Sequence, residues 1–314
     1  MSASLTTTPT TVTQNSTIST TTSSRSAPIQ LSKELLKQAR DRLLEFQNEK
    51  MEASEDAEPI IIAQNVSLEA YIKYIKTERK LPIRIRLVNG KIIAHEIPLS
   101  SHGAVANRIS FLILAWNNQL RGTNEEDLIV GSNYYTADLT IRPLGLSRPP
   151  VGWGSNSEGR PYPTLVVEVG NSESIPSLHD LSTGYFSPQT TIQIYIAIKI
   201  FPTRHDGTRA MLALRYLRTN QNNTVPDIII SFGTGHLHHN TIAFLTNRAG
   251  VRLANITGVG FSAIACNAPR IPNYQLHIFA IELFNGAFGG IPAGAVNGFF
   301  LDLWELQDIV LNDF

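Results

Sequence analysis

The chain has 314 residues, of which 42% are hydrophobic and 17% charged, so it can bury a sizeable core in one large domain or two smaller ones. Its 26 Lys and Arg residues balance its 26 Asp and Glu residues, which excludes nucleic-acid binding by bulk charge alone, and no apolar run is long enough to predict a membrane helix. The single cysteine, Cys266, excludes an intrachain disulfide and a thiolate zinc site, so we expect an intracellular protein of the cytoplasm or nucleus.

The N-terminal part of the sequence divides into a tail, a helix and a linker. Residues 1–30 are rich in Ser and Thr and nearly free of large apolar side chains, so they predict a disordered tail. From Ser32 to about Met51, apolar residues recur at helical spacing and predict an amphipathic packing helix, with a partner-binding helix as the alternative. Acids between Glu52 and Glu58 then predict a linker. We therefore assign 31–58 to helix and linker and expect a single domain over 59–314.

Three local patterns begin this domain. Ser67 to Lys76 predicts a helix with Ser67 as its N-cap. Ile83 to Ala94 alternates apolar and polar residues around an Asn-Gly pair, which predicts a β-hairpin. Ser101-His102-Gly103 then leads into a predicted helix from Ala104 to Leu120.

The same region carries a local excess of positive charge. Residues 71–121 contain nine Lys and Arg residues and only two acids, which is the local positive charge that phosphate binding would require. A merely solvated face is the more common explanation of such a charge pattern. If the patch is real, Arg84, Arg86 and Lys91 are its candidate nucleic-acid contacts.

Two apolar runs are each interrupted by one acid. Asp138 lies within the predicted strand Tyr134 to Pro143, and Glu168 lies within Thr164 to Gly170. A third strand, Ile192 to Phe201, follows a helical pattern, which indicates a βαβ crossover. Because an unpaired acid in a buried strand is costly, two such acids predict a bound cation; exposed edge-strand acids are the alternative.

The rest of the chain is predicted to be rich in strands. The histidines at 236, 238 and 239 lack a second ligand cluster, so they predict a polar loop rather than a zinc site. A surface loop is expected from Gly145 to Pro163. Strands are expected at 210–217, 227–232, 276–284 and 298–303, and a closing helix at 303–311.

The order of these elements resembles a known family. A helix, an Asn-Gly hairpin, Ser-x-His before a helix, a strand with an acid, a Val-Val-Glu-Val strand, a helix ending in Tyr and a further strand are similar to the Uma-type restriction endonuclease domain, a branch of the PD-(D/E)XK nuclease superfamily. The final Ala-Ile-Lys-Ile-Phe run resembles fungal members. The resemblance spans about Val66 to Val310 and implies an α/β fold, with a restriction-endonuclease-like αβββαβ core and a β-rich C-terminal extension.

The resemblance also implies a metal site. Asp138 would be the metal-binding aspartate and Glu168 the glutamate of the E-x-K element. Two carboxylates can hold Mg²⁺ or Mn²⁺, which neutralises a scissile phosphate and activates a water. His102 matches a family histidine that would contact nucleic acid, and a helix-capping role is its alternative.

The chain departs from the family at the catalytic lysine. The lysine position two residues after the glutamate is Gly170, and the alternative position on the following helix is Leu181. Lys199 is a candidate replacement. Glu96 is a candidate for the family acid that normally precedes the hairpin glycine.

Two functions remain open. The first is a divalent-metal endonuclease that hydrolyses DNA, with Asp138, Glu168, Lys199 and Glu96 as its catalytic residues. The second is a catalytically lapsed nuclease-fold protein that binds nucleic acid or a protein partner. We expect DNA as the partner, a homodimer as a candidate assembly, and no membrane association.

Overall fold

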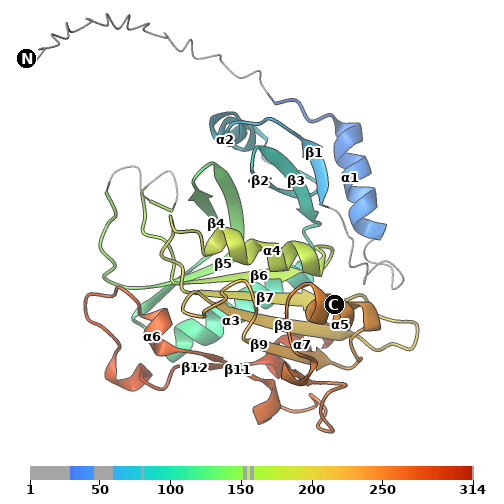
Figure 1. Ribbon diagram of the computed structural model, residues 1–314, viewed down its shortest axis with the longest axis vertical. Coiled ribbons are helices and arrows are strands. Elements are labelled where there is room, and N and C mark those ends of the chain that lie inside the picture. The colour runs from blue at the N-terminus through green and yellow to red at the C-terminus, as the bar shows by residue number, and fades with distance from the viewer. Residues whose placement is uncertain (1–28, 46–58, 79–80, 151–153, 156–158, 313–314) are drawn as a thin grey trace, which may run out of the picture.

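The computed structural model describes residues 29–45, 59–78, 81–150, 154–155 and 159–312. The protein has a mixed α/β fold, in which helices cover both faces of a ten-stranded sheet (Figure 1). Most of the predicted tail, the acidic linker up to Glu58 and Trp153 lie outside the described residues. None of the described helices combines the length and the apolar character that crossing a bilayer requires.

The main sheet runs in the order β1-β3-β2-β5-β6-β7-β8-β9-β10, with β4 paired to β5. The β6–β7 and β9–β10 pairs are parallel and the other pairs are antiparallel. A separate antiparallel pair joins β11 to β12. The strands are β1 Ile60–Ala63, β2 Arg84–Val88, β3 Lys91–Glu96, β4 Leu120–Val130, β5 Asn133–Pro143, β6 Leu165–Gly170, β7 Ile194–Ile200, β8 Ala210–Leu217, β9 Ile228–Gly233, β10 Ile256–Gly258, β11 Gln275–Ile278 and β12 Phe299–Asp302.

The helices form three groups around this sheet. Helices α3, α6 and α7 join one apolar core, α4 and α5 join the core on the other face, and α1 and α2 pack on the β1–β3–β2 end. The predicted N-terminal helix therefore belongs to the packed body rather than standing apart from it. The helices are α1 Lys33–Glu45, α2 Leu68–Thr77, α3 Ser100–Trp116, α4 Ile175–Tyr185, α5 His239–Asn247, α6 Ala280–Leu283 and α7 Leu303–Asn312.

Local chemistry explains the elements that the sequence predicted well. The side chain of Ser67 caps α2 by accepting a hydrogen bond from the Ala70 N–H at 3.2 Å. Asn89 and Gly90 take left-handed φ values of 50° and 72°, the geometry that two-residue hairpin turns favour. The predicted βαβ crossover is confirmed, because β6, α4 and β7 follow one another and the two strands are parallel.

Strand β5 has two neighbours along one edge. Strand β4 pairs with it from Asn133 to Pro143, so every other partner must use the opposite edge. On that edge, β2 meets the start of β5 at Tyr134, whereas β6 pairs with residues 139–141. Asp138 therefore lies where the neighbour of β5 changes from β2 to β6. This change of partner positions the candidate site.

Strand β4 was not predicted, and the helix before it was predicted four residues too late in the sequence, at 104–120 instead of Ser100–Trp116. Helix α3 ends at Trp116, and Asn117 takes an extended conformation that starts the turn into β4. The middle of β4 reads Arg-Gly-Thr-Asn-Glu-Glu-Asp, which has no apolar alternation. As an edge strand paired with β5, it can form without that signal.

Three other predictions were corrected. The strand predicted over 276–284 ends at Ile278, and α6 follows. The predicted polar loop of histidines is confirmed only for 236–238, because α5 begins at His239 and the His238 ring caps it by accepting a hydrogen bond from the Asn240 N–H. The loop predicted from Gly145 to Pro163 contains no described helix or strand, but Ser155 within it is buried and accepts a hydrogen bond from the Ile129 N–H.

Candidate functional site

Asp138 is the centre of a buried cluster of polar side chains. One carboxylate oxygen, Oδ1, accepts hydrogen bonds from Arg84 at 2.8 Å and from His102 Nε2 at 2.6 Å. The other, Oδ2, accepts the backbone N–H of Val169 at 2.7 Å, two residues beyond the part of β6 that pairs with β5. Burial alone would raise the pKa of Asp138, but the charges of His102 and Arg84 outweigh it and hold that pKa below its ordinary value.

Glu168 has a different environment from Asp138. Its neighbours Val167 and Val169 join the α3 core, so alternation along β6 directs Glu168 toward α4. There its carboxylate accepts a hydrogen bond from the hydroxyl of Tyr185. Burial, and then the nearby charge of Asp138, raise the pKa of Glu168 well above its ordinary value. The arrangement therefore favours a protonated Glu168 beside an ionised Asp138.

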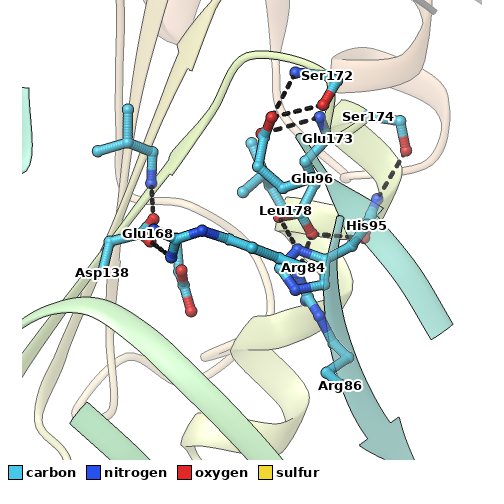
Figure 2. Close-up of polar contacts among 12 residues, drawn as sticks. Arg84, Arg86, His95, Glu96, Asp138, Glu168, Ser172, Glu173, Ser174 and Leu178 are labelled. Atoms are coloured by element: carbon cyan, nitrogen blue, oxygen red, sulfur yellow. Dashed lines mark hydrogen bonds and ion pairs between the residues drawn. The ribbon is translucent and has the colours of Figure 1, made fainter. Parts of the chain in front are cut away.

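A second buried acid, Glu173, lies at the start of the loop into α4. It pairs with Arg86 at 2.5 Å and with His95 Nδ1 at 3.0 Å, and it accepts a hydrogen bond from Ser177 Oγ at 2.6 Å (Figure 2). Despite burial, the charges of Arg86 and His95 lower the pKa of Glu173 to about 2. The sheet interior thus holds a second fully paired carboxylate.

Glu96 is fully buried and supports the same loop. Both of its oxygens accept hydrogen bonds, from the N–H groups of Ile97, Asn171, Ser172 and Glu173 and from the Ser172 hydroxyl. Figure 2 shows its carboxylate facing the loop backbone rather than Asp138. Its observed contacts therefore fix the loop conformation.

The two positions at which the family resemblance implies a lysine, Gly170 and Leu181, are both closely packed. A Cβ atom added at Gly170 would lie 2.9 Å from the end of the Leu178 side chain and 3.2 Å from that of Glu173, so a side chain there would require Leu178 to shift. Leu181 is buried in the core beneath α4. Lys199 is the cross-strand partner of Gly170 on β7, is 3% exposed, and donates to the Asn171 carbonyl at 2.5 Å.

The donor set fits a magnesium or manganese ion poorly. Both oxygens of Asp138 already accept hydrogen bonds, two of them from cationic side chains. The carboxylate of Glu168 accepts a hydrogen bond from the Tyr185 hydroxyl. Among the described residues, no three His, Cys, Asp or Glu side chains gather in a way that could hold a metal ion. We derive no catalytic step through a metal here.

The candidate nucleic-acid contacts separate in the structure. Arg86 and His102 are buried at 4% and 3% exposure, and each contacts an acid. Arg84 is mostly buried and also pairs with exposed Glu125 at 2.5 Å. Lys91 is exposed. The first three thus contribute to an internal network, and His102 contacts Asp138 from the first turn of α3 instead of capping that helix.

Sequence reasoning missed Glu173 and His95. Glu173 is the one charged residue between Val169 and His179, a signal that could have drawn attention to it. His95 follows Ala94 on β3, and nothing in its local pattern indicates a buried ion pair. Both residues depend on contacts between segments far apart in the sequence.

Replacing Glu168 by Gln tests the protonation assignment. A raised pKa means that the wild type loses stability as pH rises above the ordinary value of 4.5 toward the folded-state value. Gln does not ionise and can still accept the Tyr185 hydroxyl. We expect Glu168→Gln to gain stability over wild type as pH rises, by at most about 1.4 kcal/mol per pH unit, in urea unfolding at several pH values. A constant difference across pH would show that folding does not raise the pKa of Glu168.

Comparisons with known proteins leave the family open. No protein-family model matches the chain, and no curated protein matches it significantly. A crystal structure described as a candidate nuclease of DUF820 from Anabaena variabilis is similar at a TM-score of 0.37 and 13% identity. That match covers 58% of this chain and 98% of the other. This degree of similarity is too low to support a functional conclusion.

Proposed function

We propose that this protein is a nuclease-fold protein that binds nucleic acid without hydrolysing it. The resemblance is supported by the order α3, β4, β5, β6, α4 and β7, which is the αβββαβ order of the nuclease core. Asp138 and Glu168 come from the strands on which that core carries its acids.

The proposal that the protein does not hydrolyse nucleic acid is supported mainly by the contacts of Asp138. Cationic side chains surround the acid that would bind the metal: Arg84 and His102 both contact Asp138 Oδ1. In a hydrolytic site, that oxygen would be needed as a metal ligand. The second requirement, a lysine beside the glutamate, is also missing, because that position is Gly170.

The exposed lysines favour nucleic acid as the partner. Lys73 and Lys76 are exposed on α2, and Lys91 is exposed at the hairpin. The hairpin and the start of α2 are adjacent, because the Val66 N–H donates to the Gly90 carbonyl at 2.9 Å. The start of α2 is therefore beside the hairpin that carries Lys91, and Lys73 and Lys76 lie further along the same helix. Lysines at these exposed positions can bind a duplex backbone through its phosphates.

The magnesium-dependent endonuclease is the second candidate. It is favoured by one observation, the closeness of Asp138 to Glu168, whose pKa the charge of Asp138 raises. Rearrangement of Arg84 and His102 would be required before Asp138 could bind a metal.

A plasmid assay separates the two candidates. With Mg²⁺ or Mn²⁺ present, we expect wild type and Glu168→Gln to show the same background nicking of supercoiled DNA. Nicking by wild type that both Glu168→Gln and Asp138→Asn abolish would establish the endonuclease instead.

The same mixtures test binding. We expect a gel shift that weakens steeply between about 50 and 200 mM salt, because lysine contacts release counterions from DNA. The combined Lys73→Glu, Lys76→Glu and Lys91→Glu changes should weaken it at least tenfold. The control is Arg252→Glu, at an exposed residue outside the patch, which should change it little. Salt-independent binding would contradict this proposal.

A further inference from the structure

A small cavity lies beside the loop that follows β6. Its volume is about 200 Å³, and it is lined by Leu99, Asn171, Arg209 and residues 200–203. Asn171 and residues 200–203 stand at the carboxyl ends of the parallel strands β6 and β7. Ligands commonly bind at this edge of α/β sheets.

Arg209 brings an uncompensated positive charge to the cavity. Its guanidinium is partly buried, and its Nε donates to the Phe201 carbonyl at 2.8 Å. In the part of the chain that the structure describes, no acid forms an ion pair with it. Burial accordingly lowers the pKa of Arg209. A half-buried guanidinium without an acid partner suits an oxyanion, which it can bind through two parallel N–H groups.

Asn171 adds a second polar group. Its side chain is buried, and its Nδ2 donates to Ser101 Oγ at 3.1 Å while its Oδ1 has no hydrogen-bond partner. The Ser101 hydroxyl can donate as well as accept, so the amide can turn and offer an N–H to a ligand. The Asn171 carbonyl, in turn, holds the ammonium of Lys199.

The start of α3 contributes to the same electrostatic environment. Leu99 occupies the N-cap position, lines the cavity, and provides no side-chain hydrogen bond to the first turn of this 17-residue helix. The positive end of the helix dipole therefore adds to the charges of Arg209 and Lys199. The nearby acid Glu96 is directed toward the loop after β6, where both of its carboxylate oxygens accept hydrogen bonds.

We propose that this cavity binds one phosphate group, with Arg209 as its main contact and Asn171 as a further donor. The small volume suits a single phosphate, either free inorganic phosphate or the terminal phosphate of a nucleotide chain. This inference does not depend on whether the protein cleaves or binds nucleic acid through the residues discussed above.

Calorimetric titration of the full chain with inorganic phosphate tests the site. We expect binding to wild type that Arg209→Gln weakens about tenfold or more and that Arg204→Gln leaves unchanged. Arg204 is on the same connection between β7 and β8 and bonds the His236 carbonyl, so it is a matched control. No binding by wild type in the millimolar range, or equal binding by Arg209→Gln, would overturn the proposal.

A second pair of variants keeps Arg209 in place. Thr203 is exposed and lines the cavity. Thr203→Glu introduces a carboxylate that competes for Arg209, so it should abolish phosphate binding, whereas the uncharged Thr203→Gln should retain it. If the two variants bind phosphate equally well, the cavity is not the site.

Oligonucleotides distinguish the two phosphate sources. A short single strand with a 5′-phosphate is compared with the same strand without it. Tighter binding of the phosphorylated strand, lost in Thr203→Glu, identifies a nucleotide terminus as the source. Equal binding of both strands, together with phosphate binding in calorimetry, identifies free phosphate.

Discussion

Replacing Arg86 by Met is expected to destabilise the protein by about 3–5 kcal/mol in urea unfolding. Arg86 is 4% exposed and pairs with Glu173, which is 2% exposed. Without the guanidinium, Glu173 would remain as a buried charge supported by His95, whose own pKa burial lowers. The loss should exceed the value of the ion pair itself, because most of it is the cost of an uncompensated buried charge.

A double-mutant cycle checks this interpretation. Arg86→Met combined with Glu173→Gln should recover much of the lost stability, since it removes both charges. The stability of the control Lys91→Met, at an exposed residue on the adjacent β3, should stay within about 0.5 kcal/mol of wild type.

The pKa of Glu173, about 2, also predicts how stability depends on pH. Its lowered pKa gives wild type stability that is present above about pH 4.5 and lost as pH falls toward 2, and Arg86→Met should reduce this acid sensitivity. Additive losses in the double mutant would contradict the pairing.

The second large effect is expected for Asp138→Ala, with a loss of about 3 kcal/mol. This substitution leaves Arg84, His102 and the Val169 N–H without their shared acceptor. An acid kept for metal binding should behave in the opposite way, because its removal would relieve repulsion with Glu168 and raise stability. The sign of the change in the free energy of unfolding therefore separates a structural acid from a metal ligand.

Unfolding should be measured with and without Mg²⁺. If Asp138 is structural, wild type and Asp138→Ala should respond to the ion alike, and the exposed-site control Asp41→Ala should lose little stability. If wild type gains stability from Mg²⁺ and Asp138→Ala does not, or if the variant is more stable than wild type, Asp138 is a metal ligand.

Two buried acids are each paired with an arginine from the same strand. Arg84 and Arg86 are two residues apart on β2. Arg84 pairs with Asp138, and Arg86 pairs with Glu173. A guanidinium neutralises a buried carboxylate without an open coordination position for water. These two ion pairs therefore stabilise the buried acids.

The best predictions from sequence concerned elements fixed by local chemistry. The cap at Ser67, the Asn-Gly turn and the apolar runs that became β5, β6, β7 and β8 depend on a residue and its near neighbours, so their positions could be identified directly. Strand β4 could not, because its partner β5 provides the pairing that its own polar sequence does not indicate.

The amino-acid sequence by itself determined the hairpin, the β6–α4–β7 crossover, the placing of Asp138 and Glu168 on strands, and the identities Gly170 and Leu181. These features follow from periodicity and from residue identity. The tertiary structure alone decided what each acid contacts. Arg84 is 54 residues from Asp138, and Arg86 is 87 residues from Glu173. Whether an acid binds a metal or pairs with an arginine depends on which side chains from distant parts of the sequence lie next to it in the folded core. No local pattern in the sequence carries that information, because the energy of a buried charge is set by its neighbours in space.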